Sequence, residues 1–247
     1  MALLKAENIS VKFDNNQILD NVSIELNEGE LVSILGISGS GKTTLFNVLS
    51  GLIRPKNGKV LLNEEDITGQ TGHMSYMLQK DLLLPYKTII DNVSLPLVIK
   101  GAKKKQAREA ILPYLKTFGL QDCMNMYPAK LSGGMKQRAA LLRTYMCQKP
   151  ISLLDEPFSA LDAITKTEIH QWYLSIMKEL KLSTLFITHD IDEAILLSDR
   201  IYILGSSPAT IKKEIRINPA DVRKKDLLLS EAFLQYKRTI LNSIGDN

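Results

Sequence analysis

The chain has 247 residues, of which 45% are hydrophobic and 23% are charged. This composition is typical of a folded globular protein and excludes disordered, collagen-like and coiled-coil chains, and the length predicts one large domain or one domain with a subdomain. The net charge of +4 comes from 31 basic and 27 acidic residues spread along the chain, so charge alone does not indicate a nucleic-acid-binding protein.

The N-terminal part of the chain predicts two kinds of strand. Residues 8–13 and 22–26 alternate between apolar and polar side chains, which is typical of antiparallel strands. Residues 31–35 form a continuous apolar run that ends at Gly36, as expected for a strand covered on both faces. A helical pattern follows over residues 43–50.

The middle of the chain, from about Pro85 to Pro150, contains no clear strand and is predicted to be helical. It is interpreted as an insertion between two halves of an α/β core. Pro113 lies inside the helical pattern of residues 103–118, which predicts a kink or two shorter helices. The three consecutive lysines at residues 103–105 are interpreted as a solvated helix face rather than a binding patch.

Strands and helices alternate in the rest of the chain. Apolar runs over residues 151–154 and 185–187 predict strands, and helical patterns follow over residues 163–180 and 191–197. Such alternation predicts a mostly parallel sheet with helices on both faces, and ligands of such sheets bind at the carboxyl ends of the strands. The tail, residues 226–244, predicts an amphipathic helix.

Cysteine usage and apolar stretches indicate the cellular setting. Cys123 and Cys147 are far apart and form no Cys-x-x-Cys motif, so they are predicted to be reduced thiols of a cytoplasmic protein. No stretch reaches the roughly 18 uninterrupted apolar residues that span a bilayer, and the first seven residues lack the apolar segment of a secretory leader. We therefore expect neither a membrane-spanning helix nor a leader.

Residues 36–43 fit the pattern Gly-x-x-x-x-Gly-Lys-[Ser/Thr] between a predicted strand and a predicted helix. Glycines let the backbone approach an anion closely, and the N–H groups at the positive end of a helix bind phosphate. Lys42 is expected to reach the β- and γ-phosphates, and the Thr43 hydroxyl to ligate Mg²⁺. A glycine-rich turn without a ligand is the alternative, which the strand–turn–helix context disfavours. The predicted phosphate-binding residues are Gly36, Ile37, Ser38, Gly39, Ser40, Gly41, Lys42, Thr43 and Thr44.

Two acids, Asp155 and Glu156, end the apolar strand predicted over residues 151–154. An acid at the edge of a sheet can hold Mg²⁺ directly or through water, which predicts this role for Asp155. Glu156 could accept a proton from an attacking water. Acids in the first turn of a helix are the ordinary alternative, so the prediction depends on the neighbouring phosphate-binding residues.

A second glycine-containing motif, Leu-Ser-Gly-Gly-Met-Lys-Gln-Arg, occupies residues 131–138. Ser132 can cap a helix whose first N–H groups are left open by Gly133 and Gly134, which makes a second anion-binding helix end. A capped loop without a ligand is the alternative for these residues alone. Together with residues 36–43 and the Asp-Glu strand about twenty residues later, the motif makes the chain resemble the ATP-binding subunits of ABC transporters, and residues 131–138 resemble the signature motif of that family.

The resemblance implies further site residues. Phe13 resembles the aromatic residue that stacks on adenine, with a core residue of a strand as the alternative. Gln79 resembles the glutamine that ligates Mg²⁺ and water. Asp162 closes residues 159–162, which resemble the family's D-loop. His189 resembles the histidine that contacts the γ-phosphate, and the resemblance gives catalysis to Glu156, His189 and Lys42 and metal binding to Thr43, Gln79 and Asp155.

Three other residues receive no functional role. His73 and His170 match no motif of the family, and Trp172, on the helix predicted after the D-loop, is interpreted as a core residue.

The implied fold is α/β. It combines a P-loop NTPase core, which has a mostly parallel sheet with flanking helices, with an N-terminal antiparallel β subdomain and an inserted α-helical subdomain. The expected division is residues 1–84 and 151–215 for the two parts of the core, 85–150 for the insertion and 216–247 for a helical tail. Met135, where many members have Gln, and residues 79–86 and 198–204 resemble the branch that imports nitrate, sulfonates, taurine and thiamine-precursor pyrimidines.

The resemblance implies an ATPase that supplies energy to an importer of a small solute. Two copies are expected to sandwich two ATP molecules head to tail with Mg²⁺, to bind a separate transmembrane permease, and to act indirectly with an extracellular solute-binding protein and without nucleic acid. The expected location is the cytoplasm, peripheral on the inner face of the cell membrane. Two alternatives remain: an exporter subunit with a separate permease, and an ABC-type ATPase acting on nucleic acid or ribosomes.

Overall fold

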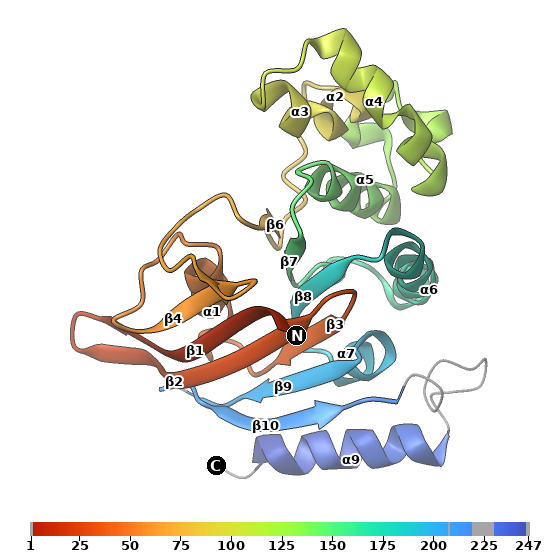
Figure 1. The fold of residues 1–247 in the computed structure, drawn as a ribbon. Helices are drawn as coiled ribbons and strands as arrows, with labels where there is room; N and C mark the ends of the chain where they lie inside the picture. The colour runs from red at the N-terminus through yellow and green to blue at the C-terminus, as the bar shows by residue number, and fades with distance from the viewer. Residues whose placement is uncertain (1, 207, 219–229, 246–247) are drawn as a thin grey trace.

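The computed structural model describes residues 2–206, 208–218 and 230–245. Two sheets carry the fold (Figure 1). The smaller is antiparallel and has the strand order β2-β1-β4-β5. Its strands are β1 (Ala2–Phe13), β2 (Asn16–Asn27), β4 (Asn57–Leu62) and β5 (Glu65–Asp66).

The larger sheet has the strand order β10-β9-β3-β8-β7-β6. All its pairings are parallel except that of β10 with β9. Its strands are β3 (Leu31–Leu35), β6 (Ser75–Met77), β7 (Ile151–Asp155), β8 (Ser183–Thr188), β9 (Arg200–Leu204) and β10 (Ile211–Arg216). The sequence analysis did not predict β4, β5, β6, β9 or β10, partly because β5 and β6 are too short to show a period.

The helices lie around and beyond the large sheet. They are α1 (Lys42–Leu49), α2 (Ile89–Val93), α3 (Leu95–Ile99), α4 (Lys104–Thr117), α5 (Gly133–Tyr145), α6 (Ala163–Leu180), α7 (Ile191–Leu197) and α9 (Glu231–Gly245), with short 3₁₀ helices at Gln121–Cys123 and Pro128–Lys130. Figure 1 shows α2, α3 and α4 together at one end of the molecule and α9 beside β10 at the other. Among the described residues, none of these helices combines the length and apolar character needed to cross a membrane.

Strand β3 lies at the centre of the packing. All five of its residues are buried, and because successive side chains of a strand point to opposite faces, they divide between different cores. Val32 and Ile34 join the cluster formed with α1 and the small sheet, whereas Leu31 joins the cluster under the inserted helices and Leu35 the one under α7 and α9. The continuous apolar run therefore reflects burial on both faces, as expected.

Of the two alternatives predicted at Pro113, a kink or two shorter helices, the second is wrong, because α4 is a single helix that runs through Pro113. Proline removes one backbone hydrogen bond inside a helix, but Pro113 is exposed and water can satisfy the carbonyl that is left without a partner. The predicted tail helix begins at Glu231 in the described part of the chain, and residues 226–229 of that prediction lie outside it. Cys123 and Cys147 are free thiols, as predicted.

Gly58 tests the close contact between β4 and its neighbour β1 in the small sheet. It has a φ of +95°, and a Cβ there would lie 2.4 Å from the Glu7 carbonyl oxygen and 2.5 Å from that of Asn8. Gly58→Ala should reduce the free energy of unfolding by about 2–4 kcal/mol, because left-handed strain adds to overpacking. The measurement is the urea unfolding midpoint.

Gly29→Ala is the matched control for this prediction. Gly29 also has a positive φ, of +70°, but a Cβ there would meet nothing within 4 Å. This variant should lose only the strain component, about 1–2 kcal/mol. Equal losses in the two variants would contradict the packing argument.

Candidate nucleotide-binding site

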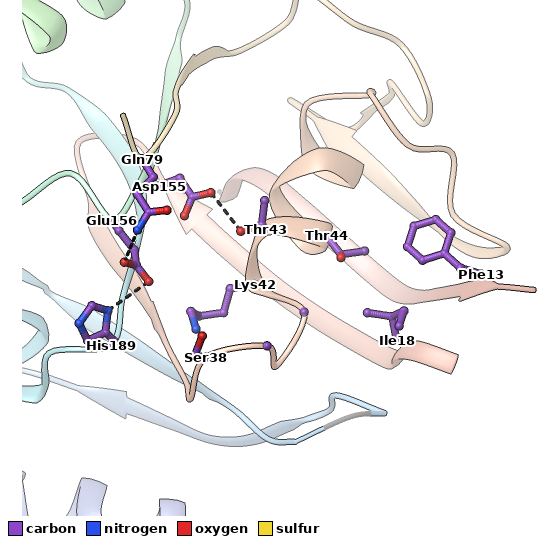
Figure 2. Close-up of a pocket in the computed structure, with 12 residues that line it drawn as sticks. Phe13, Ile18, Ser38, Lys42, Thr43, Thr44, Gln79, Asp155, Glu156 and His189 are labelled. Atoms are coloured by element: carbon purple, nitrogen blue, oxygen red, sulfur yellow. Dashed lines mark hydrogen bonds and ion pairs between the residues drawn. The ribbon is translucent and has the colours of Figure 1, made fainter. Parts of the chain in front are cut away.

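A pocket of about 530 Å³ lies at the carboxyl ends of β3, β7 and β8 (Figure 2). Segments far apart in the sequence contribute to it. The residues that line it are Phe13, Ile18, Ser38, Gly39, Gly41, Lys42, Thr43, Thr44, Gln79, Asp155, Glu156 and His189. The structure thus brings together eleven of the residues predicted from the sequence and adds one, Ile18, for which the local sequence gave no signal.

The loop between β3 and α1 turns sharply because of its glycines. Gly39 and Gly41 have φ values of +79° and +92°, which side-chain-bearing residues rarely adopt. Gly41 is the N-cap of α1, and its carbonyl accepts the Leu45 N–H at 2.9 Å. The open N–H groups at the start of α1 therefore face the pocket, where the helix dipole favours an anion.

Lys42 is folded back onto this loop. Its Nζ donates to the carbonyl oxygens of Gly36 at 2.9 Å and Ile37 at 2.7 Å, and the residue is 6% exposed. Burial lowers the pKa of Lys42, although Glu156 and Asp155 act in the opposite direction. Two backbone carbonyls thus hold a poorly solvated ammonium group beside the pocket, where an anionic ligand would stabilise its charge.

Asp155 is the last residue of β7 and is 6% exposed. Its Oδ2 accepts a hydrogen bond of 3.1 Å from the Thr43 hydroxyl, at the start of α1. Burial raises the pKa of Asp155, because a carboxylate loses hydration there, although the Thr43 hydroxyl and Lys42 oppose the shift. A buried carboxylate and a hydroxyl at this separation form an all-oxygen donor pair of the kind that hard divalent cations prefer.

Glu156 joins two segments at the mouth of the pocket. Its Oε2 accepts from Gln79 Nε2 at 3.0 Å, and its Oε1 lies 3.1 Å from Nδ1 of His189 (Figure 2). Glu156 has a φ of +45°, so its backbone is strained. Its N–H donates to the Ile187 carbonyl at 3.0 Å, which holds this conformation against β8. His189 is more than half exposed, and its side chain reaches over the pocket.

Helix α5 begins with the second predicted anion-binding motif. Ser132 is its N-cap and accepts the Met135 N–H at 3.3 Å, as predicted. A Cβ on Gly133 would lie 3.2 Å from Leu161, and one on Gly134 would lie 3.0 Å from Thr165, so this helix start packs against the D-loop and the first turn of α6. Asp162 caps α6 by accepting the N–H groups of residues 164 and 165.

Seven predicted residues do not line the pocket. Gly36, Ile37 and Ser40 belong to the phosphate-binding loop, and the first two contribute the carbonyls that hold Lys42. Ser132, Gly133, Gly134 and Asp162 form a separate surface.

Other residues that organise this region were missed by the sequence analysis. Gln137, buried on α5, donates to the Pro157 carbonyl, directly after Glu156. Arg143, one to two turns further along, donates to the Leu82 carbonyl at 2.7 Å and to that of Asp81. Their partners are backbone carbonyls distant in the sequence, which no local motif reveals. His170, given no role, is buried and hydrogen-bonded to Glu193.

Two aromatic residues, Trp172 and Phe13, had been considered as core residues. Trp172 is only partly buried, and it packs edge-on against Phe118 with Arg138 over its ring. Phe13 is 47% exposed, so the alternative of a core residue is wrong.

Comparison with known proteins identifies the family. The sequence profile of the ABC transporter family matches residues 19–159. The formylaminopyrimidine import ATP-binding protein ThiZ of Halalkalibacterium halodurans is 42% identical over 224 residues, which cover 90% of this chain and 87% of that protein. The nitrate import ATP-binding protein NrtD of Synechocystis is 39% identical over 204 residues, covering 82% of this chain and 77% of that protein.

Among solved structures, the ATP-binding cassette MJ0796, a dimer in a post-hydrolysis state bound to ADP and Pi, superposes with a TM-score of 0.73. It is 30% identical in sequence, and the match covers 87% of this chain and 99% of that one. The predicted α/β fold with a P-loop NTPase core is therefore confirmed. The chain belongs to the ABC transporter family and is an ATP-binding subunit with ATPase activity.

Proposed function

We propose that this chain is the energy-supplying subunit of an importer, working as a head-to-tail pair of copies that hold two ATP molecules between them. One observation carries the proposal: among the described residues, Ser132, Gly133 and Gly134 do not line the pocket, and the start of their helix is exposed at Ser132 and Gly133. Each anion-binding surface is therefore half of a site, and a two-fold pair supplies the other half twice. The dimeric cassette MJ0796 supports this arrangement.

The lining residues support one orientation of ATP. The N–H groups of residues 38–44 bind the phosphates, and Lys42 leaves the carbonyls of Gly36 and Ile37 to reach the β- and γ-phosphates. Phe13 lies at the opposite end of the pocket from Glu156 and His189 (Figure 2). Its exposed ring stacks on the adenine, so the nucleotide spans the pocket lengthwise.

Thr43, Asp155 and Gln79 are the residues that would hold Mg²⁺. The Thr43 hydroxyl and the buried Asp155 carboxylate, whose oxygens lie 3.1 Å apart, would provide two oxygen ligands. The Gln79 side chain, also in the pocket lining, would provide a third. When bound, Mg²⁺ neutralises charge on the phosphates of ATP.

Hydrolysis uses the group of residues around Glu156. Glu156 accepts a proton from the water that attacks the γ-phosphorus, and His189 and Lys42 stabilise the charge of the transferring phosphoryl group. The hydrogen bonds from Gln79 and the contact with His189 hold the two Glu156 oxygens in place beforehand. In the pair of copies, Ser132 and Gly134 of one contact the γ-phosphate bound by the other, with Gly133 and Asp162 beside them. Loss of that phosphate separates the copies, because the affinity of the two surfaces differs before and after hydrolysis.

The inserted helices support a docking site for a short helix of a separate permease. Residues 82–86 begin three positions after Gln79 and expose Leu82 (51%) and Tyr86 (72%). Asn92, fully buried, holds this segment through hydrogen bonds with the backbone of Leu84, Lys87 and Thr88. A hollow of about 450 Å³ lies next to α2, lined by Ile90, Lys104, Lys105, Arg108, Glu109 and Leu112.

The relatives support a small solute of the nitrate, taurine or thiamine-precursor type as cargo, and the sequence resemblance adds sulfonates. No described residue of the pocket would contact that solute, so the permease and an extracellular binding protein select it. The subunit acts in the cytoplasm, peripheral on the inner face of the cell membrane.

Co-purification tests the importer assignment. A co-purifying permease with short cytoplasmic helices supports an importer, and bound nucleic acid contradicts it.

Glu156→Gln tests the paired arrangement. The variant should bind Mg-ATP but hydrolyse it about 100- to 10,000-fold more slowly, because the amide cannot accept the proton. At saturating Mg-ATP it should therefore accumulate as an ATP-bound dimer, measured by size-exclusion chromatography with light scattering. Lys42→Ala in the same background is the control and should stay monomeric. Monomers alone from Glu156→Gln would argue against the pair.

Phe13→Ala tests the adenine contact. Removing the ring should weaken ATP binding by about 1–3 kcal/mol, or about 5- to 140-fold in Kd, measured by equilibrium titration. Phe13→Tyr keeps the stacking face and should bind ATP as the unchanged protein does. An unaltered Kd in Phe13→Ala would show that the base binds elsewhere.

Asp155→Asn should stabilise the nucleotide-free protein at neutral pH. The folded-state pKa of Asp155 is raised above its ordinary value of 3.8, so the charged carboxylate destabilises the folded state at pH values above that raised pKa. As pH falls through the raised pKa towards 3.8, the folded protein takes up the proton first and the penalty disappears. The gain in urea midpoint from Asp155→Asn should therefore shrink over that range.

Two comparisons complete this test. Asp122→Asn, at an exposed residue, should leave the midpoint unchanged. Mg-ATP should raise the midpoint of the unchanged protein but not that of Asp155→Asn. A lower midpoint for nucleotide-free Asp155→Asn at neutral pH would contradict the role assigned to burial.

A further inference from the structure

The His189 imidazole is exposed, but its neighbours in the sequence are held by hydrogen bonds to buried polar groups. Thr188 and Asp190 flank it in the sequence. The Thr188 hydroxyl donates to Glu193 Oε2 and also accepts the Asp190 N–H at 3.0 Å. Asp190 in turn caps α7 by accepting the N–H groups of Asp192 and Glu193. The position of His189 therefore depends on where Glu193 is held.

Glu193 is held by His170. Nε2 of His170 lies 3.0 Å from Glu193 Oε1, and the two residues are only 7% and 4% exposed. An ionised carboxylate can only accept hydrogen bonds, so we assign the hydrogen of this pair to Nε2 of His170. Hydrogen bonds to a charged group are strong when water is excluded, and an unpaired buried carboxylate is costly, so this contact fixes α7 against α6.

The same His170 ring also contacts the segment that carries Glu156. It packs edge-on against Phe158, with ring centroids 5.0 Å apart, and Phe158 lies two residues after Glu156. Phe158 precedes the D-loop, which leads through Asp162 into α6. One buried side chain thus touches both segments that bear the Glu156–His189 contact.

A second contact joins the same two helices one turn closer to the D-loop. Lys166 Nζ lies 3.2 Å from Asp190 Oδ2. Lys166 and His170 are four residues apart and so share a face of α6. Their partners, Asp190 and Glu193, both follow His189 in the sequence and lie at the start of α7. A movement of the D-loop end of α6 would therefore be transmitted to His189 at two points.

We propose that His170 is a positioning residue of the ATPase site, which sets the separation of Glu156 and His189 through its buried hydrogen bond to Glu193 and its contact with Phe158. The inference rests on the roles proposed above for Glu156 and His189. It also connects the D-loop to His189 through successive contacts of α6, His170, Glu193 and Thr188. His170 itself is not one of the residues that line the pocket.

His170→Ala tests the proposal by two measurements on the full chain. The sequence contains three histidines, at residues 73, 170 and 189, so side-chain NMR spectra report on His189 directly. In His170→Ala the His189 imidazole signals should shift, because its contact with Glu156 loosens. The kcat at saturating Mg-ATP should fall about 10- to 100-fold with KM changed less than about threefold, as expected for misplaced catalytic groups.

Three further variants separate positioning from stability. His170→Gln keeps an N–H donor and should restore most of kcat and the His189 signals. Thr188→Val removes the hydroxyl donor to Glu193 with little change of shape, so it should shift the His189 signals even if His170→Ala does not fold. His73→Gln, at a residue that lies outside the site, should change neither measurement.

Unchanged His189 signals with kcat within about twofold of the unchanged protein, in folded His170→Ala or Thr188→Val, would overturn the proposal. Failure of the proposed catalytic roles would look different. In that case Glu156→Gln and His189→Ala would retain ATPase activity, while His170→Ala would still shift the His189 imidazole signals.

Discussion

The parallel backbone pairing of β3, β8 and β7 is the constraint on which the site depends. Leu35 pairs with Thr188, and Asp155 pairs with Ile187, so the three strands end at nearly the same level. The residues that follow each strand therefore meet at one edge of the sheet. The phosphate-binding loop lies more than 100 residues before Glu156 and His189 in the sequence, but all three lie around one pocket.

The scaffold keeps groups at this edge that are unfavourable by themselves. Lys42 and Asp155 are both buried with pKa values shifted against their charged forms, and Glu156 has a strained backbone. Strained and poorly solvated groups persist where the surrounding structure determines their positions. Here the β-strands and the buried cluster around Phe46 and Leu45 on α1 provide that support. Binding of a charged nucleotide would relieve part of the cost.

Helices α5 and α6 are linked to the same edge through polar contacts between segments. Gln137 and Arg143, both on α5, reach the backbone beside Glu156 and after Gln79, respectively. Lys166 and His170 on α6 reach the segment around His189. Helices α5 and α6 thus each contact a segment that carries residues of the proposed catalytic machinery. In the proposed pair of copies, both helices begin at the surface between the copies, so a change at that surface would be transmitted to the pocket.

The sequence by itself determined the local chemistry of this protein. The glycine-rich loop before α1, the Asp-Glu pair after β7 and the Ser132 cap of α5 depend on residues close together in the chain, where backbone geometry follows from residue type. Strand β3 was predicted from its continuous apolar run for the same reason. Only the tertiary structure decided the rest: the short strands, the continuity of α4 through Pro113, the role of Ile18 and the buried pair of His170 and Glu193. These features depend on partners far away in the sequence, on solvent exposure and on strand pairing, because a buried hydrogen bond between distant helices leaves no periodic or local pattern by which it could be recognised.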